Sequence, residues 1–184
     1  METRRKLGEA KFFLERLHES EDNYDIFSYY LSAFLSAWRS VVDIMLYDVV
    51  EHYFGLSRDE KIFRRDFKHL AQILGNKEAL QFIYWFNHKI GILQENPLWE
   101  KRIQIDHRGY PSIKLFVESP LSTASTRIWY GPFPFLSEIP TEVPIKSTYI
   151  ADAPEILEMC EKGLAEMKAI VNEAKKRVWN KIMI

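Results

Sequence analysis

Two arginine–histidine pairs in the sequence share a spacing of five positions, Arg64 with His69 and Arg102 with His107. Histidine is the side chain whose unperturbed pKa lies closest to neutrality, so it can accept or donate a proton at physiological pH. An arginine nearby keeps its positive charge and can stabilise negative charge that develops beside the histidine. Both pairs are therefore candidates for an acid–base site.

The place of each pair within its element separates the two candidates. Residues five apart point about 140° away from each other in a regular helix, so such a pair converges only where a helix ends. Arg64 and His69 fall in the middle of a predicted helix, with Arg64 facing solvent. Arg102 and His107 fall in the last turns of a short helix that ends before Gly109. We therefore expect Arg102 and His107 to form the site.

The helix that carries Arg102 also turns a second charge toward the interior. On a helical wheel for residues 97–107, Arg102 and Asp106 lie among the apolar residues of the inward face. A charge on a buried face must be paired or used. The two residues are four apart and can pair with each other, so a purely structural role is one interpretation.

Polar side chains also fall on the buried sides of two other predicted helices. Asp66 lies within the apolar stripe of one, while Ser36 and Arg39 belong to a polar stripe on another. Under the structural interpretation, the serine allows close helix packing, and Arg39 forms an ion pair with Asp66. Under the functional interpretation, His107 stands at the mouth of one polar cleft that is lined by Ser36, Arg39, Asp66, Arg102 and Asp106.

Hydrophobic periodicity predicts that helices carry these residues. Apolar residues recur at helical spacing over residues 3–19, 25–54, 57–75, 77–94, 97–107 and 152–178. The segment 25–54 is apolar on almost every side, which predicts a central, buried helix. Gly55 and Gly75 are expected to end the helices before them. Asn96, followed by Pro97, is expected to begin the short helix.

Between residues 112 and 150 the pattern changes. Prolines cluster there, and short β-branched and aromatic runs replace the helical spacing. We predict an all-α fold, an antiparallel up-and-down bundle of about five to six helices. Residues 112–150 would form a small β-hairpin or irregular, proline-rich arm before the C-terminal helix. The chain, residues 1–184, is predicted to be a single domain.

Composition excludes several kinds of chemistry. The seven glycines are scattered, so the sequence has no GxGxxG or GxxxxGK phosphate loop. The single cysteine, Cys160, excludes CxxC redox pairs, cysteine-based zinc knuckles and an internal disulfide. The formal net charge is −1, so any contact with nucleic acid must be local.

Nothing in the sequence predicts contact with a membrane. The longest uncharged run, Ile26 to Trp38, is too short to span a bilayer. The first residues are charged and lead into an amphipathic stretch, unlike a secretory signal peptide. We therefore expect a soluble, cytoplasmic protein.

Basic residues gather at the end of the last predicted helix, where they complement the helix dipole. Their simplest interpretation is a solvated helix end, and the alternative is contact with phosphates. They are Lys175, Lys176, Arg177 and Lys181.

The sequence resembles the HEPN (higher eukaryotes and prokaryotes nucleotide-binding) superfamily in three features. They are the helical bundle, the central helix and the stretch from Asn96 to Gly109, which reads NPLWEKRIQIDHRG. The signature of that family is Arg-x4-6-His near the end of a late helix. The likeness covers residues from about 5 to 110 and the last helix, with the 112–150 arm as an addition.

The resemblance implies RNA cleavage that needs no metal or cofactor, in a homodimer whose two motifs meet. His107 would take the proton from a ribose 2′-hydroxyl, and Arg102 would stabilise charge on the attacked phosphate. Active members usually carry a polar residue after the arginine, whereas this chain has Ile103. The resemblance therefore implies either a ribonuclease of toxin, defence or stress type, with a cognate antitoxin or other protein partner, or an inactive relative that binds RNA or protein.

A carboxylate-bridged metal bundle is the rival from another class, and it requires Glu-x-x-His on two inward faces. The sequence offers Glu15 with His18, and the near match Asp66 with His69. Glu15 falls on the polar side of its predicted helix, which argues against this interpretation.

Overall fold

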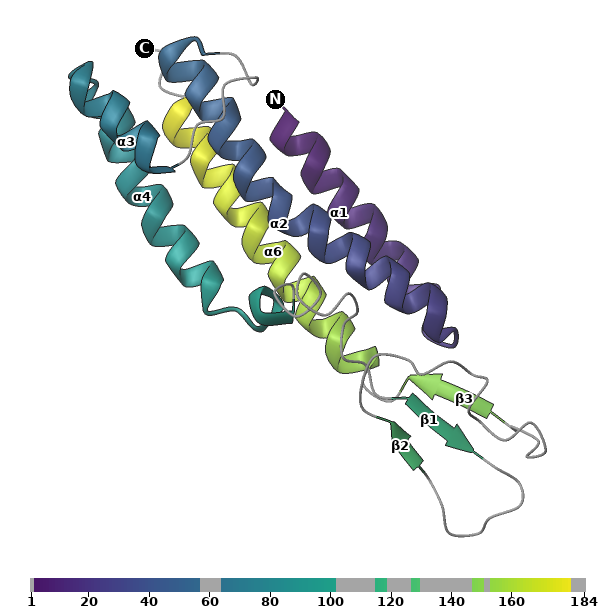
Figure 1. The fold of residues 1–184 in the computed structure, drawn as a ribbon. Coiled ribbons are helices and arrows are strands. Elements are labelled where there is room, and N and C mark those ends of the chain that lie inside the picture. Colours follow the sequence, from purple (N-terminus) through teal and green to yellow (C-terminus); the bar gives the residue numbers. More distant parts are fainter. Residues whose placement is uncertain are drawn as a thin grey trace.

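The computed structural model describes residues 2–56, 64–101, 115–118, 127–129, 147–150 and 153–179. This part of the chain is mostly helical, which confirms the helical class predicted from the sequence (Figure 1). Its helices are α1 (Glu2–His18), α2 (Tyr24–Phe54), α3 (Arg64–Ile73), α4 (Lys77–Gln94) and α6 (Ala153–Val178). Residues 97–101 form a further short helical stretch. Across these described segments, no helix combines the length and apolar character needed to cross a membrane.

Four helix ends follow the local chemistry of the sequence. Gly55 and Gly75 have φ angles of 66° and 62°, in the left-handed region that favours glycine, and they end α2 and α3 as predicted. The side chain of Asn23 accepts the N–H of Ile26 at 3.2 Å where α2 begins. Asn76 caps α4 in the same way.

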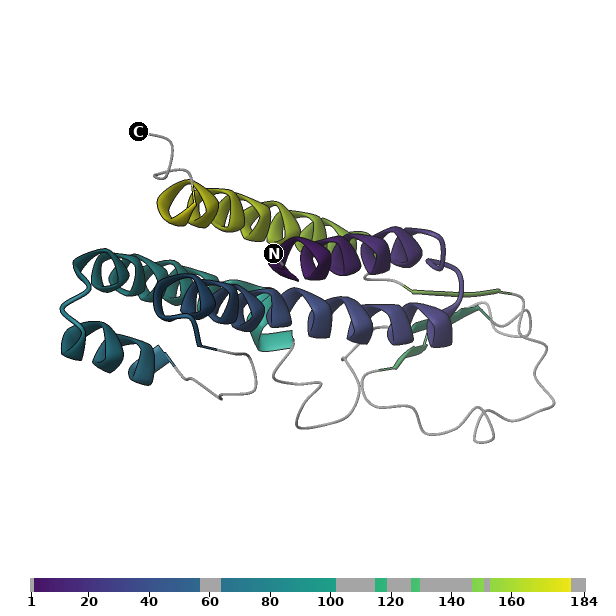
Figure 2. The ribbon, with the colours of Figure 1, turned by 90° about the horizontal axis from the view of Figure 1, so that it is seen from above.

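The long helices lie side by side. Helix α1 packs along α2 and against α6, which also contacts α2 and α4, while α3 folds back on α4 (Figure 1). In Figure 2 the helices α1 and α4 run in the direction opposite to α2 and α6. The three helices α1, α2 and α6 thus come from the two ends of the chain and share one core.

Helix α2 supplies more of that core than any other helix, including the fully buried Phe34 and Trp38. Burying a side chain of this size contributes roughly 1.5–3 kcal/mol or more. Helix α2 keeps one exposed side: Tyr29 is 68% exposed, and Ser36 and Asp43 are exposed as well. These three residues recur every seven positions, about two helical turns, so they form one exposed line along α2.

Three short strands lie within the segment that the sequence predicts to be a hairpin or irregular arm. They are β1 (Leu115–Glu118), β2 (Arg127–Trp129) and β3 (Ser147–Ile150). They pair antiparallel in the order β2-β1-β3, with Phe116 opposite both Ile128 and Tyr149. The structure therefore has a three-stranded sheet here, and the rest of the 112–150 arm lies outside the described residues.

Candidate functional site

The start of the helix that the sequence assigns to the site is capped by Asn96, as predicted. The Asn96 side-chain oxygen accepts the backbone N–H of Leu98 at 2.9 Å. The side-chain amide nitrogen of the same residue donates to Glu166 Oε2, on α6, at 2.8 Å. One asparagine thus both begins the helical stretch 97–101 and ties it to α6.

The side chain of Leu98 occupies space on α6 that a glycine leaves open. Leu98 is fully buried, and a Cβ atom built on Gly163 would lie 2.1 Å from Leu98 Cδ1. A glycine inside a helix costs about 1 kcal/mol relative to alanine. The close approach of Leu98 explains why a glycine stands at this position of α6.

A side chain of α2 also contacts α6 at Gly163. The indole N–H of Trp38 donates to the carbonyl oxygen of Gly163 at 2.9 Å. The ring of Trp38 also meets the ring of Trp99 edge-on, with 6.1 Å between centroids. Helices α2 and α6 therefore hold the 97–101 stretch between them.

Arg39 brings a positive charge to this stretch. Its guanidinium carbon lies 4.5 Å from the centroid of the Trp99 ring, and its Nη1 atom lies 3.0 Å from Asp43 Oδ1. The side chain is 25% exposed, so the cation is partly desolvated. Trp99 precedes Arg102 by three positions in the sequence. Arg39 therefore contacts the helical stretch that leads into the predicted motif.

Ser36 lies one turn before Arg39 on α2 and is exposed. Its carbonyl oxygen accepts the hydroxyl of Ser40 at 2.8 Å. Both predicted residues on α2 are therefore accessible or half-accessible, as residues of a cleft must be.

Asp66 lies far from Ser36 and Arg39. Its Oδ1 atom is 3.9 Å from Arg65 Nε, and its neighbour Phe67 packs on Phe54 with 5.1 Å between ring centroids. Phe54 lies about 22 Å along α2 from Arg39, at a rise of about 1.5 Å per residue. The structure does not bring Asp66 to Arg39, and the ion pair suggested for them is wrong because Arg39 pairs within its own helix.

The remaining residues of the predicted site, Arg102, Asp106 and His107, lie outside the described residues, so their roles stay predictions. The competing pair, Arg64 and His69, lies within the regular helix α3, where this spacing points side chains apart. His69 is exposed on that helix.

The residues suggested for a metal bundle are engaged with other partners. Glu15 pairs with Lys11 at 3.3 Å on the exposed side of α1. The Nε2 atom of His18 lies 3.0 Å from Glu161 Oε1. Within the described ranges there is no cluster of three or more His, Cys, Asp or Glu side chains suited to hold a metal ion. Cys160 is fully buried, and burial raises the pKa of its thiol.

A polar cluster that sequence reasoning missed joins α4 to α6. Glu173 accepts hydrogen bonds from Trp85 Nε1 at 2.7 Å and Arg177 Nη2 at 3.0 Å, and it pairs with Lys89 Nζ at 3.0 Å. Partial burial raises the pKa of Glu173, but the hydrogen bonds from Lys89, Arg177 and Trp85 outweigh it, so the pKa falls below its usual value. Arg177 is therefore more than a solvated helix end.

The contact between Leu98 and Gly163 was also missed, although the sequence holds a signal for it. A glycine in the middle of an otherwise regular helical pattern usually has a packing reason. The pattern alone does not say which side chain approaches that glycine.

Comparison of the chain with protein-family models, with curated proteins and with solved structures finds no match. The assignment of a function therefore rests on the residues and contacts described above.

Proposed function

We propose that this chain is a divergent HEPN-like protein that cleaves RNA without a metal ion, with Arg102 and His107 as its catalytic pair. The observation that supports the proposal best is the anchoring of residues 97–101. Leu98 packs at Gly163 on α6, and Trp99 packs under Arg39 on α2. These contacts fix the start of the predicted helix 97–107, which carries Arg102 and His107 and which we call the motif helix. A catalytic side chain needs such a rigid support, because small displacements cost large factors in rate.

The proposed mechanism uses the ribose as the nucleophile. His107 accepts the proton of the 2′-hydroxyl, and the 2′-oxygen attacks the adjacent phosphorus. The new bond closes a cyclic phosphate while the bond to the 5′-oxygen of the next nucleotide breaks. That oxygen takes up a proton from solvent water, and His107 returns its own proton to solvent. Arg102 stabilises the charge that develops on the phosphate oxygens. Attack by the substrate's own hydroxyl requires neither a metal-bound water nor a cofactor.

The polar lining of the proposed cleft comes from α2 and from the motif helix. Arg39 adds a second positive charge beside Trp99, and Ser36 and Asp106 complete the lining. Asp66 is left out, because it lies near the far end of α2. Two protomers would bring their motifs together in a cytoplasmic homodimer, of toxin, defence or stress type, with an antitoxin or other protein as partner.

A second candidate function follows from Ile103. Because active HEPN proteins usually carry a polar residue at that position, this chain could be an inactive relative that binds RNA or protein. That alternative predicts no cleavage and a salt-sensitive association with RNA, or an association with a protein.

Incubation of RNA with the full chain in EDTA tests the two candidates. The ribonuclease proposal expects cleavage that persists in EDTA, yields cyclic phosphate ends and is lost in His107→Ala. Cleavage that His107→Ala leaves unchanged would contradict the assignment. An intact RNA with measurable binding would favour the alternative. Light scattering on the same samples tests the homodimer, and a monomer mass would remove that part of the proposal.

A further inference from the structure

Exposed cations gather where α1 begins and α6 ends. Arg4 lies in the first turn of α1, and Lys168, Lys175 and Lys176 lie on the C-terminal half of α6; all four are exposed. None of the four forms an ion pair with another residue of the described segments. We call these four residues the basic face.

The register between α1 and α6 brings Arg4 to the lysines. The two helices pack against each other and run in opposite directions (Figure 2). The contact between His18 and Glu161 sets their register. Both helices rise about 1.5 Å per residue, so counting back along α1 to Arg4 reaches the level of Lys175 on α6. The basic face therefore spans two helices.

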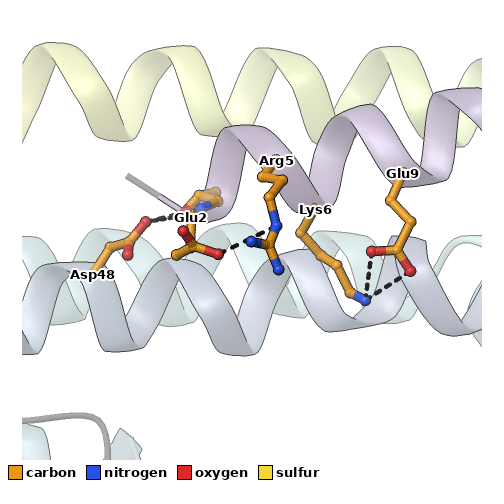
Figure 3. Close-up of polar contacts among 6 residues, drawn as sticks. Glu2, Arg5, Lys6, Glu9 and Asp48 are labelled. Carbon is orange, nitrogen blue, oxygen red and sulfur yellow. Dashed lines mark hydrogen bonds and ion pairs between the residues drawn. The ribbon is translucent and has the colours of Figure 1, made fainter.

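The carboxylates at this end of the molecule are mostly engaged elsewhere. Glu2 lies 3.4 Å from Arg5 Nε, and Lys6 pairs with Glu9 one turn further on (Figure 3). Asp48 is buried on α2, where its Oδ2 atom accepts the backbone N–H of Thr3 at 2.9 Å and the Thr3 hydroxyl at 2.5 Å.

Three further carboxylates lie nearby on α6 and α2. Glu173 is held by Lys89, Trp85 and Arg177 beside α4. Glu51, near the end of α2, is exposed. Glu166, on the same half of α6 as Lys168, is exposed as well. Four unpaired cations against these two exposed carboxylates leave the end of the molecule locally positive, although the chain as a whole has a net charge of −1.

The residues between these cations indicate which ligand the face suits. The other exposed positions on this half of α6 are Ala165, Glu166, Ala169, Asn172 and Arg177. Protein interfaces depend on aromatic, arginine and large apolar anchors. This half of α6 exposes no aromatic or large apolar side chain, and its exposed arginine, Arg177, is engaged with Glu173 and the Trp85 ring. A phosphate backbone needs only well-placed positive charges. The face therefore suits a polyanion better than a protein partner.

We propose that the basic face binds the phosphate backbone of single-stranded RNA. This inference rests on the proposed function, since it supplies a second contact for the RNA whose cleavage is assigned to the motif helix. Lys168 lies about 8 Å along α6 from Gly163, where that helix is anchored, so one strand can reach both. The face holds the strand, and the motif acts on it.

Binding of a single-stranded RNA of about 20 nucleotides tests the inference. Every ribose of the probe carries a 2′-O-methyl group, so the probe cannot be cleaved by the proposed mechanism. Fluorescence anisotropy gives its affinity for the full chain between about 50 and 200 mM salt. The test variant is the triple substitution Lys168→Gln, Lys175→Gln and Lys176→Gln.

A matched control changes the net charge equally at exposed cations elsewhere. It combines Arg65→Gln, Lys77→Gln and Lys162→Gln, on α3, α4 and the N-terminal half of α6. We expect the test variant to bind about tenfold or more weakly, with a salt dependence shallower by about 2 in log–log slope, since each phosphate contact contributes about 0.7. The control variant should bind like the wild type.

Three outcomes would overturn the inference: no salt-dependent binding by the wild type, equal loss in both triple variants, or equally tight binding of a poly-glutamate of similar length. The test also separates this inference from the proposed function. If the chain does not cleave RNA but binds the blocked probe through these lysines, the ribonuclease assignment is wrong and the inference about the basic face stands. If cleavage depends on His107 but both triple variants bind the probe equally, the ribonuclease assignment stands and the inference about the basic face is wrong.

Discussion

The indole N–H of Trp38 donates to the carbonyl oxygen of Gly163 at 2.9 Å and joins two helices across 125 positions of the sequence. Leu98 packs at the same glycine, and Trp99 packs on Trp38. This one junction therefore connects α2, α6 and the start of the motif helix. A change at Gly163 should disturb the proposed site without touching its catalytic residues.

We expect Gly163→Ala to destabilise the protein by about 1–2 kcal/mol. The added Cβ would displace Leu98, which costs about 1–3 kcal/mol for overpacking, and the better helix propensity of alanine returns up to about 1 kcal/mol. Urea denaturation measures the change. Gly91→Ala is the matched control, because a Cβ on Gly91 has no neighbour within 4 Å. That control should be neutral or slightly stabilising, and equal losses in the two variants would contradict the packing argument.

The bond between Thr3 and Asp48 should contribute to the attachment of α1. In Thr3→Val the buried carboxylate loses the hydroxyl donor, which should cost about 1–3 kcal/mol. Thr3→Ser keeps the hydroxyl and should cost less. Thermal unfolding followed by circular dichroism compares the two variants, and the argument fails if serine is no better than valine.

Glu173 should make the protein more stable above its pKa than below it. Its pKa in the folded protein is lower than in the unfolded chain, so its contribution is present at neutral pH and is lost as the pH falls through the folded value. The side chain is 35% exposed, so solvent screens the effect and we expect less than about 1 kcal/mol.

Glu173→Gln should therefore reduce stability at pH 7 and leave it nearly unchanged at a pH below the folded pKa. Urea denaturation at the two pH values measures the difference. Glu158→Gln, which removes an exposed pair with Lys162, is the control and should have a smaller effect. A loss from Glu173→Gln that is as large in acid as at neutral pH would show that the charge of Glu173 is not the cause.

The positions of the helices follow from the sequence, whereas the partners of their polar residues do not. Periodicity places the helix at 77–94, and the structure has α4 at Lys77–Gln94. Gly55, Gly75 and Asn96 mark helix ends because each has a local conformational or capping role that needs no other element.

A helical wheel tells which side of a helix is buried, but it does not tell which neighbour covers that side or at what level. A pairing of Arg39 with Asp66 was expected for that reason, yet Phe67, the neighbour of Asp66, packs on Phe54, which lies about 22 Å along α2 from Arg39. The contacts of Arg39 with Trp99, and of Gly163 with Leu98, depend on the relative shift of three helices. That shift is a property of the packed core, so spacing within one helix does not determine it.

The most direct test of the proposed function compares two histidines that both follow an arginine by five positions. In EDTA, His107→Ala should lower the rate of RNA cleavage about 10²–10⁴-fold, the usual effect of removing a general base. His69→Ala, an exposed residue within α3, should leave that rate unchanged. A His107→Ala rate equal to that of the wild type, or an equal loss in the two variants, would contradict the assignment of the site.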